Sequence, residues 1–185
     1  MGDDGAMPPI ATNPLDLHLD DVLAAPTDVG RVELIVRRPA VGAREVVDAA
    51  RLDVDLGLEG DRWSTQDLRT TPAFLAAQLT LMSSRALAAL APDRSMWPLA
   101  GDQLIVDFDL GVDNLPPGTR LAIGSATIEV SEAPHTGCSK FRARFGDDAV
   151  RWVNDPAGRQ LRLRGMNARV VESGTVRVGD TIRKR

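Results

Sequence analysis

The segment around Cys138 combines residue types and a spacing that suit thiol chemistry. His135 lies three residues before the cysteine and Lys140 two residues after it. We expect a strand to end just before this segment and a helix to begin at it. A helix N-terminus and nearby cations lower a thiol pKa, so Cys138 is a candidate nucleophile or soft metal ligand. A lone cysteine often simply packs in a core, but Pro134 and Gly137 favour an exposed turn.

The glycine-rich stretch 57–62 is a weaker candidate site. Its backbone amides could cradle an anion, but it lacks the Lys-Ser/Thr ending of a P-loop, and a purely structural turn explains it equally well. A cysteine hydrolase would need His135 or His18 as its base, and no second motif supports one. No carboxylate spacing marks a hydrolase with paired acids.

Charge is distributed unevenly along the chain. Residues 135–185 carry twelve Lys/Arg against five Asp/Glu, although the whole chain has a net charge of −4. Nearly all of these cations are arginines, whose planar fork binds phosphate or carboxylate with two hydrogen bonds. The carboxy-terminal third is therefore expected to hold an anionic ligand, unless these arginines lie on solvated faces and pair with acids.

Composition excludes several classes of protein. A length of 185 residues with 43% hydrophobic residues fits one globular domain, and a single cysteine with two histidines rules out disulfide scaffolds and structural zinc. The absence of tyrosine and the few aromatics argue against nucleic-acid binding. The acidic, Pro/Gly-rich start is unlike a signal peptide and no apolar run is long enough to span a membrane, so we expect a cytoplasmic protein.

Short alternating segments divided by turn residues predict a mainly β fold, a β-barrel with a few peripheral helices. We expect a flexible or helical extension over residues 1–27, unstructured in its first dozen residues, and one barrel domain over 28–185. The expected strands cover residues 31–37, 45–47, 52–56, 78–82, 103–108, 119–123, 126–131, 161–164, 168–172 and 175–178. The expected helices cover residues 14–23, the segment from Ser83 to Pro92, 139–145 and 147–153, with Asn13, Ser83 and Asp147 as caps.

Six motifs in a fixed order resemble the MOSC family, named after the carboxy-terminal domain of molybdenum cofactor sulfurases. They lie at residues 57–62, 78–83, 100–104, 121–126, 134–141 and 174–182. The resemblance implies a β-barrel that binds the molybdenum cofactor, a pterin dithiolene with a terminal phosphate. It also places Cys138 at the family's cysteine, which ligates molybdenum or carries sulfur.

Family members range from sulfur-transfer modules attached to a pyridoxal-phosphate domain to stand-alone reductases of N-hydroxylated compounds, and the chain length favours a stand-alone module. The anionic pterin would then be the ligand, with an electron-donor protein or a cofactor-accepting enzyme as partner. The implied catalytic residues are Cys138, which would also ligate the metal, His135 and Lys140. The implied cofactor-binding residues are Gly60, Asp61, Arg62, Asp102, Gln103, Arg142, Arg144 and Arg164.

Two departures from the family pattern leave alternatives open. The chain has Asp102-Gln103 where members commonly have Glu-Asn, and no histidine follows Arg62 in the stretch 63–68. A non-catalytic carrier of cofactor or sulfur is therefore the first alternative to a reductase. A member that keeps the fold without the cofactor is the second.

Overall fold

The computed structural model describes residues 13–66 and 71–185, so the prediction for the first dozen residues and part of the stretch 63–68 lie outside the described residues. The mainly β fold predicted from the sequence is confirmed. The strands are β1 (Val29–Arg37), β2 (Glu45–Val47), β3 (Ala49–Asp53), β4 (Gly57–Leu58), β5 (Leu79–Ser83), β6 (Leu104–Asp107), β7 (Arg120–Ile123), β8 (Ala126–Val130), β9 (Met166–Glu172), β10 (Gly174–Arg177) and β11 (Thr181–Lys184).

Seven of the described strands close into a barrel. Their order around the barrel is β1-β6-β5-β9-β8-β7-β11, and β11 pairs with β1 to complete the circle. All neighbours are antiparallel except β5 and β6, which run parallel because a helix crosses between them. The strand β2 extends the barrel beyond β1, and β10, β3 and β4 form a small separate sheet.

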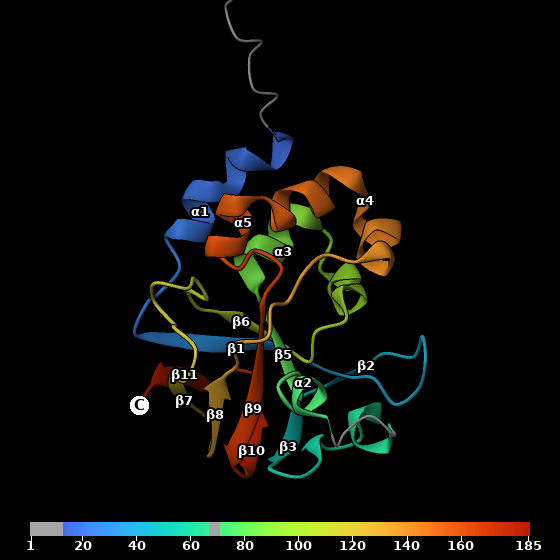
Figure 1. The fold of residues 1–185 in the computed structure, drawn as a ribbon, viewed down its shortest axis with the longest axis vertical. Coiled ribbons are helices and arrows are strands. Elements are labelled where there is room, and N and C mark those ends of the chain that lie inside the picture. Colours follow the sequence, from blue (N-terminus) through green and yellow to red (C-terminus); the bar gives the residue numbers. More distant parts are fainter. Residues whose placement is uncertain (1–12, 67–70) are drawn as a thin grey trace, which may run out of the picture.

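Four of the helices, α1, α3, α4 and α5, gather on one side of the barrel, whereas Figure 1 shows α2 apart from them, at the level of the strands. The helices are η1 (Pro14–His18), α1 (Leu19–Leu23), η2 (Arg62–Thr65), α2 (Pro72–Leu75), α3 (Ser84–Leu90), η4 (Arg94–Ala100), α4 (Ser139–Asn154) and α5 (Pro156–Gln160). Asn13 caps η1 and Ser83 caps α3, as their side chains predict. The indole Nε1 of Trp152 on α4 donates to Asp16 on η1, which ties the N-terminal helices to α4.

Two apolar cores follow from this arrangement. One fills the barrel with alternate side chains of its strands, among them Leu81, Leu104 and Ile128. The other lies between the barrel and the helices and contains Trp152 and Phe141 of α4. The second core fixes the start of α4 against the barrel, and that helix start carries Cys138.

Two of the predicted strands differ from the structure. Residues 161–164 form a turn rather than a strand, with Arg162 in the left-handed region (φ 49°), and β9 begins at Met166. The alternating Leu-Arg-Leu-Arg pattern there matches a strand because both leucines face the helical core. The strand expected at 52–56 lies at Ala49–Asp53, and Asp53 turns the chain by accepting the backbone N–H of Asp55.

In the part of the chain that the structure describes, no helix is long and apolar enough to cross a membrane.

Candidate functional site

A turn after η4 gathers arginines from distant parts of the chain. We call residues 99–102 the Gly101 turn, because Gly101 there has a φ of 89°, which favours glycine. Three consecutive carbonyl oxygens of the turn each accept a hydrogen bond from an arginine: Leu99 from Arg144 (2.6 Å), Ala100 from Arg164 (3.1 Å) and Gly101 from Arg38 (2.9 Å). Strand β1, helix α4 and the connection before β9 therefore meet at this turn.

Four arginines beside the Gly101 turn form a cluster with an excess of positive charge. We call Arg38, Arg44, Arg62 and Arg144 the arginine cluster. The pKa of Arg44 is lowered, first by burial and then by the charges of Arg144, Arg38 and Arg62, while Asp61 alone raises it. The Nε of Arg44 is buried without a hydrogen-bond partner. Unpaired donors and repelling cations of this kind suit an anionic ligand.

Asp61 is buried inside the cluster and is paired within the protein. Its carboxylate accepts from the Nε (2.7 Å) and Nη2 (3.1 Å) of Arg38, and the backbone N–H of Trp63 donates to it at 2.9 Å. Such a bidentate ion pair fixes the end of β1 against η2. Asp61 therefore positions Arg38 and leaves the other three cluster arginines without a carboxylate partner among the described residues.

A buried chain of three groups links the Gly101 turn to the cysteine segment. The Nη1 of Arg164 donates to Asp102 Oδ2 at 2.7 Å, and the guanidinium lies 4.8 Å over the ring of Phe141. The other carboxylate oxygen faces His135 Nδ1 at 3.5 Å, which is too long for a hydrogen bond. Asp102 Oδ1, His135 Nδ1 and Arg164 Nε are all buried without partners.

His135 is held in its neutral form. Burial lowers its pKa to about 4, and the charges of Arg164 and Arg38 act in the same direction, while Asp102 raises it. The imidazole is therefore uncharged at neutral pH, contrary to the idea that it supplies a cation to Cys138. Arg164 supplies that charge instead.

Cys138 is exposed at the start of α4. The backbone N–H groups of Phe141 and Lys140 lower its pKa, and the charge of Arg164 adds to this effect, although partial burial opposes it. The preceding Gly137 is fixed on both sides by Asn154, which accepts from its N–H (2.9 Å) and donates to its carbonyl (3.0 Å). The thiol is thus accessible on a rigid support and has a lowered pKa.

The other predicted site residues are placed as follows. Lys140 is exposed beside Cys138, and Arg142 points outward into an exposed ion pair with Asp147 (3.0 Å). Gln103 is buried in the barrel wall, where its Oε1 accepts from Thr80. Gly60 has a φ of 81° and leaves room for the side chain of Arg37. The structure therefore brings Arg62, Arg144 and Arg164 toward the Gly101 turn, and leaves Arg142 outside it.

Sequence reasoning missed Arg38 and Arg44. Both flank the turn between β1 and β2, and the pattern there indicates only a hairpin. The available signal was the pair Arg37-Arg38 before Pro39, two adjacent cations at the end of a strand. Their role depends on distant residues, Gly101 for Arg38 and Arg144 for Arg44, which no local pattern shows.

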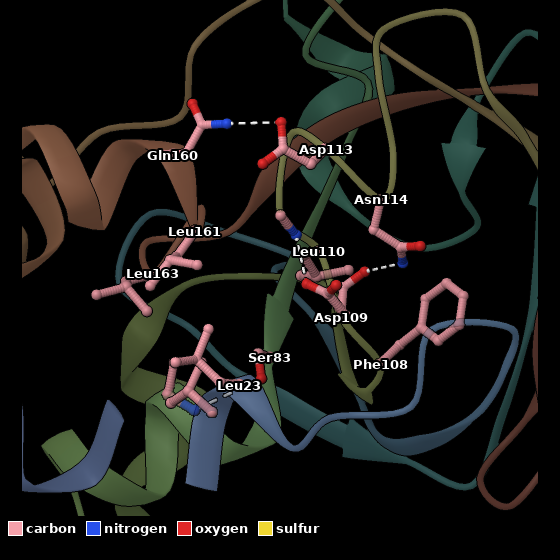
Figure 2. Close-up of a pocket in the computed structure, with 13 residues that line it drawn as sticks. Leu23, Ser83, Phe108, Asp109, Leu110, Asp113, Asn114, Gln160, Leu161 and Leu163 are labelled. Carbon is pink, nitrogen blue, oxygen red and sulfur yellow. Dashed lines mark hydrogen bonds between the residues drawn. The ribbon is translucent and has the colours of Figure 1, made fainter. Parts of the chain in front are cut away.

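Another pocket lies apart from the Gly101 turn and Cys138. It has a volume of about 190 Å³ and is enclosed by α1, the start of α3, the loop after β6 and the end of α5. Figure 2 shows Gln160 bonded to Asp113, and Asn114 bonded to Asp109, along its rim. These polar groups bind each other, so this pocket carries no feature of a reactive site.

The closed barrel, the exposed cysteine at a helix start and the arginine-lined turn define the class of protein. The family model described as "MOSC domain" matches residues 76–183, which is more than half of the chain. The chain belongs to the MOSC domain family.

Solved structures of similar fold include bacterial proteins. YuaD from Bacillus subtilis has a TM-score of 0.60 and 18% identity, over 83% of this chain and 94% of that one. YiiM from Escherichia coli has a TM-score of 0.54 and 21% identity, over 84% and 69%. YiiM from Geobacillus stearothermophilus has a TM-score of 0.56 and 13% identity, over 84% and 75%. These likenesses concern the fold. No curated protein matches the sequence.

Proposed function

We propose that this protein binds the molybdenum cofactor, with Cys138 as a ligand of molybdenum. The MOSC family is known in general for binding this cofactor and for sulfur transfer. The observation that carries the proposal is the joint presence of an exposed thiol with a lowered pKa and a cluster of arginines, three of which have no carboxylate partner among the described residues. Arg164 joins the two, because its charge acts on Cys138 and its side chain donates to the Gly101 turn.

The residues fit the chemical parts of the cofactor. A thiolate is a soft ligand that suits molybdenum, and the dithiolene brings further sulfur ligands of its own. The terminal phosphate suits Arg44, Arg62 and Arg144, because Arg38 is already held by Asp61. When bound, the cofactor supplies a metal centre for two-electron reduction or for sulfur transfer.

The chain's own side chains would orient the cofactor and exclude solvent from the site. Asp102 and Arg164 hold the Gly101 turn against the cysteine segment, and Phe141 covers the guanidinium from solvent. His135 would stay neutral at pH 7 and would line the site without adding a charge. Lys140, exposed beside the thiol, adds a positive charge at the entrance.

Purification from a host that makes the cofactor tests this function. We expect molybdenum and oxidised pterin in stoichiometric amounts in the wild type, both lost in Cys138→Ala, which leaves the fold intact because the side chain is exposed. The matched control is Ser139→Ala, one residue further along the same exposed helix start. Absence of both metal and pterin from well-folded wild type, even after incubation with released cofactor, would identify a family member without cofactor.

The exposure of Cys138 also favours a second function, delivery of cofactor or sulfur to a partner enzyme, because a partner can reach the thiol directly. Turnover separates the two. A reductase would consume an N-hydroxylated substrate with an electron-donor protein, whereas a carrier would activate a cofactor-free acceptor enzyme without turnover of its own. A reducing cytoplasm would keep the thiol available for either role.

A further inference from the structure

A second cavity lies behind the cysteine segment. It has a volume of about 330 Å³, at the lower end of the range for small-molecule sites, and it lies between residues 131–136 and the connection from α4 to β9. Its walls are mainly apolar and include Val112, Pro117, Ala133, Pro134, Val153 and Met166. Cys138 does not line this cavity, so it is separate from the thiol.

Two cations in the cavity wall lack carboxylate partners. Among the described residues, neither Arg159 nor Arg162 forms an ion pair, and Glu132 is the one acid in the lining. Burial lowers the pKa of Arg162, as expected for a partly desolvated cation without a counter-ion. A half-buried guanidinium in an apolar pocket is a site that an anion would stabilise.

The guanidinium of Arg162 is held in place by the backbone. Its Nη1 donates to the carbonyls of Leu110 (3.2 Å) and Leu115 (2.7 Å), and its own backbone lies in the left-handed region. One edge of the guanidinium is thus occupied, while no described residue is bonded to its Nε or Nη2. A fixed cation loses little side-chain freedom when it binds a ligand.

The opposite wall is also rigid. Asn167 donates to the carbonyls of Ala133 (3.1 Å) and Pro134 (3.3 Å), which fixes the segment that carries His135. His135 and Arg164 line the cavity and also belong to the chain of groups that reaches the Gly101 turn. A ligand here would therefore lie against the back of the thiol segment.

We propose that this cavity binds a small organic carboxylate with an apolar body. The carboxylate pairs with Arg162 and Arg159, and the apolar body fills the space between Pro134, Val153 and Met166. This site goes beyond the proposed cofactor function, because none of these contacts involves Cys138 or the arginine cluster.

Calorimetric titration of the purified protein with benzoate tests the proposal, with benzyl alcohol as a neutral probe of the same shape. We expect benzoate to bind and benzyl alcohol to bind about tenfold more weakly or not at all. Equal binding of the two probes, or no binding of benzoate at millimolar concentration, would overturn the proposal.

Variants locate the binding. Arg162→Gln should weaken benzoate binding about tenfold. Arg162→Gln also removes two hydrogen bonds to backbone carbonyls. Two further variants at less constrained positions therefore test the cavity without that change. Arg159→Gln removes an exposed cation and Val112→Phe fills the cavity, and both should weaken binding.

The matched controls are Arg177→Gln, an exposed arginine on β10, and Arg44→Met in the arginine cluster. Benzoate binding that survives Arg159→Gln and Val112→Phe but is lost in Arg44→Met would place the anion in the cluster and overturn the proposal. Cys138→Ala should bind benzoate like the wild type. The benzoate test therefore does not depend on whether the protein binds the cofactor.

Discussion

The two buried glutamines of the barrel wall are fully paired, whereas several buried polar side chains around the Gly101 turn are not. In the wall, Gln78 donates to Val54 and accepts from Val170, and Gln103 bridges Thr80 and Gln78. In the described part of the chain, the buried side-chain atoms without partners belong to Arg37, Arg44, Asp102, His135 and Arg164. All five lie at the turn or beside the arginines that surround it. Unpaired polar groups cost stability, and their concentration in one place indicates a site shaped for a ligand.

Substitutions in the two regions are expected to differ in their cost to stability. The largest effect is expected where the regions are joined, in Arg164→Met. Removal of the guanidinium leaves the Asp102 carboxylate buried without its charged partner, which typically costs about 3–5 kcal/mol. Urea denaturation measures the loss. A loss below about 1 kcal/mol would show that the pair is already solvated.

Acid is expected to destabilise the protein through His135. The pKa of its side chain is about 4 in the folded state and about 6.5 when unfolded, so the unfolded chain binds the extra proton between these values. This contribution to stability is full above pH 6.5 and falls as the pH drops toward 4, by a total on the order of 3 kcal/mol.

The measurement is the free energy of unfolding against pH, in the wild type and in His135→Gln. The variant should be less sensitive to acid than the wild type over this window. Parallel curves for the two proteins would show that folding does not lower the pKa of His135.

In the barrel wall, Gln103→Ala is expected to cost about 2–4 kcal/mol. The substitution leaves the backbone N–H and hydroxyl of the buried Thr80 without their acceptor. Thermal and urea unfolding measure the cost. A neutral result would mean that the wall tolerates unpaired groups as the turn does, and the contrast between the two regions would disappear.

The smallest effect on stability is expected in the arginine cluster, with Arg44→Met. Its guanidinium is repelled by three other arginines and its Nε lacks a partner, so the variant should be as stable as the wild type within about 1 kcal/mol, or more stable. The same variant should retain less pterin. A substantial loss of stability would assign Arg44 a structural role.

More of the fold than of the candidate site could be predicted from the sequence. Period-two alternation marks most of the barrel strands, and the Gly-Cys-Ser sequence marks the start of α4 correctly. Residues 161–164 show the limit of this reasoning. Their alternation matches a strand, but the side chain of Arg162 is drawn to the carbonyls of Leu110 and Leu115 and turns the backbone there.

The arrangement of the site could be predicted only in part. Cys138, His135 and Arg164 were identifiable from residue type and family resemblance, and the structure brings them close together. Arg38 and Arg44 were not, because they approach the Gly101 turn through tertiary contacts. The low pKa of His135 likewise depends on burial, which the sequence around it does not reveal.

Ligation of molybdenum by Cys138 is tested most directly by molybdenum-edge X-ray absorption of the loaded protein, wild type beside Cys138→Ser. We predict one molybdenum–sulfur contact more in the wild type than in the fraction of Cys138→Ser that still holds the cofactor. The remaining sulfur contacts should be unchanged. The same sulfur count in two equally loaded proteins would show that Cys138 is not a ligand of the metal.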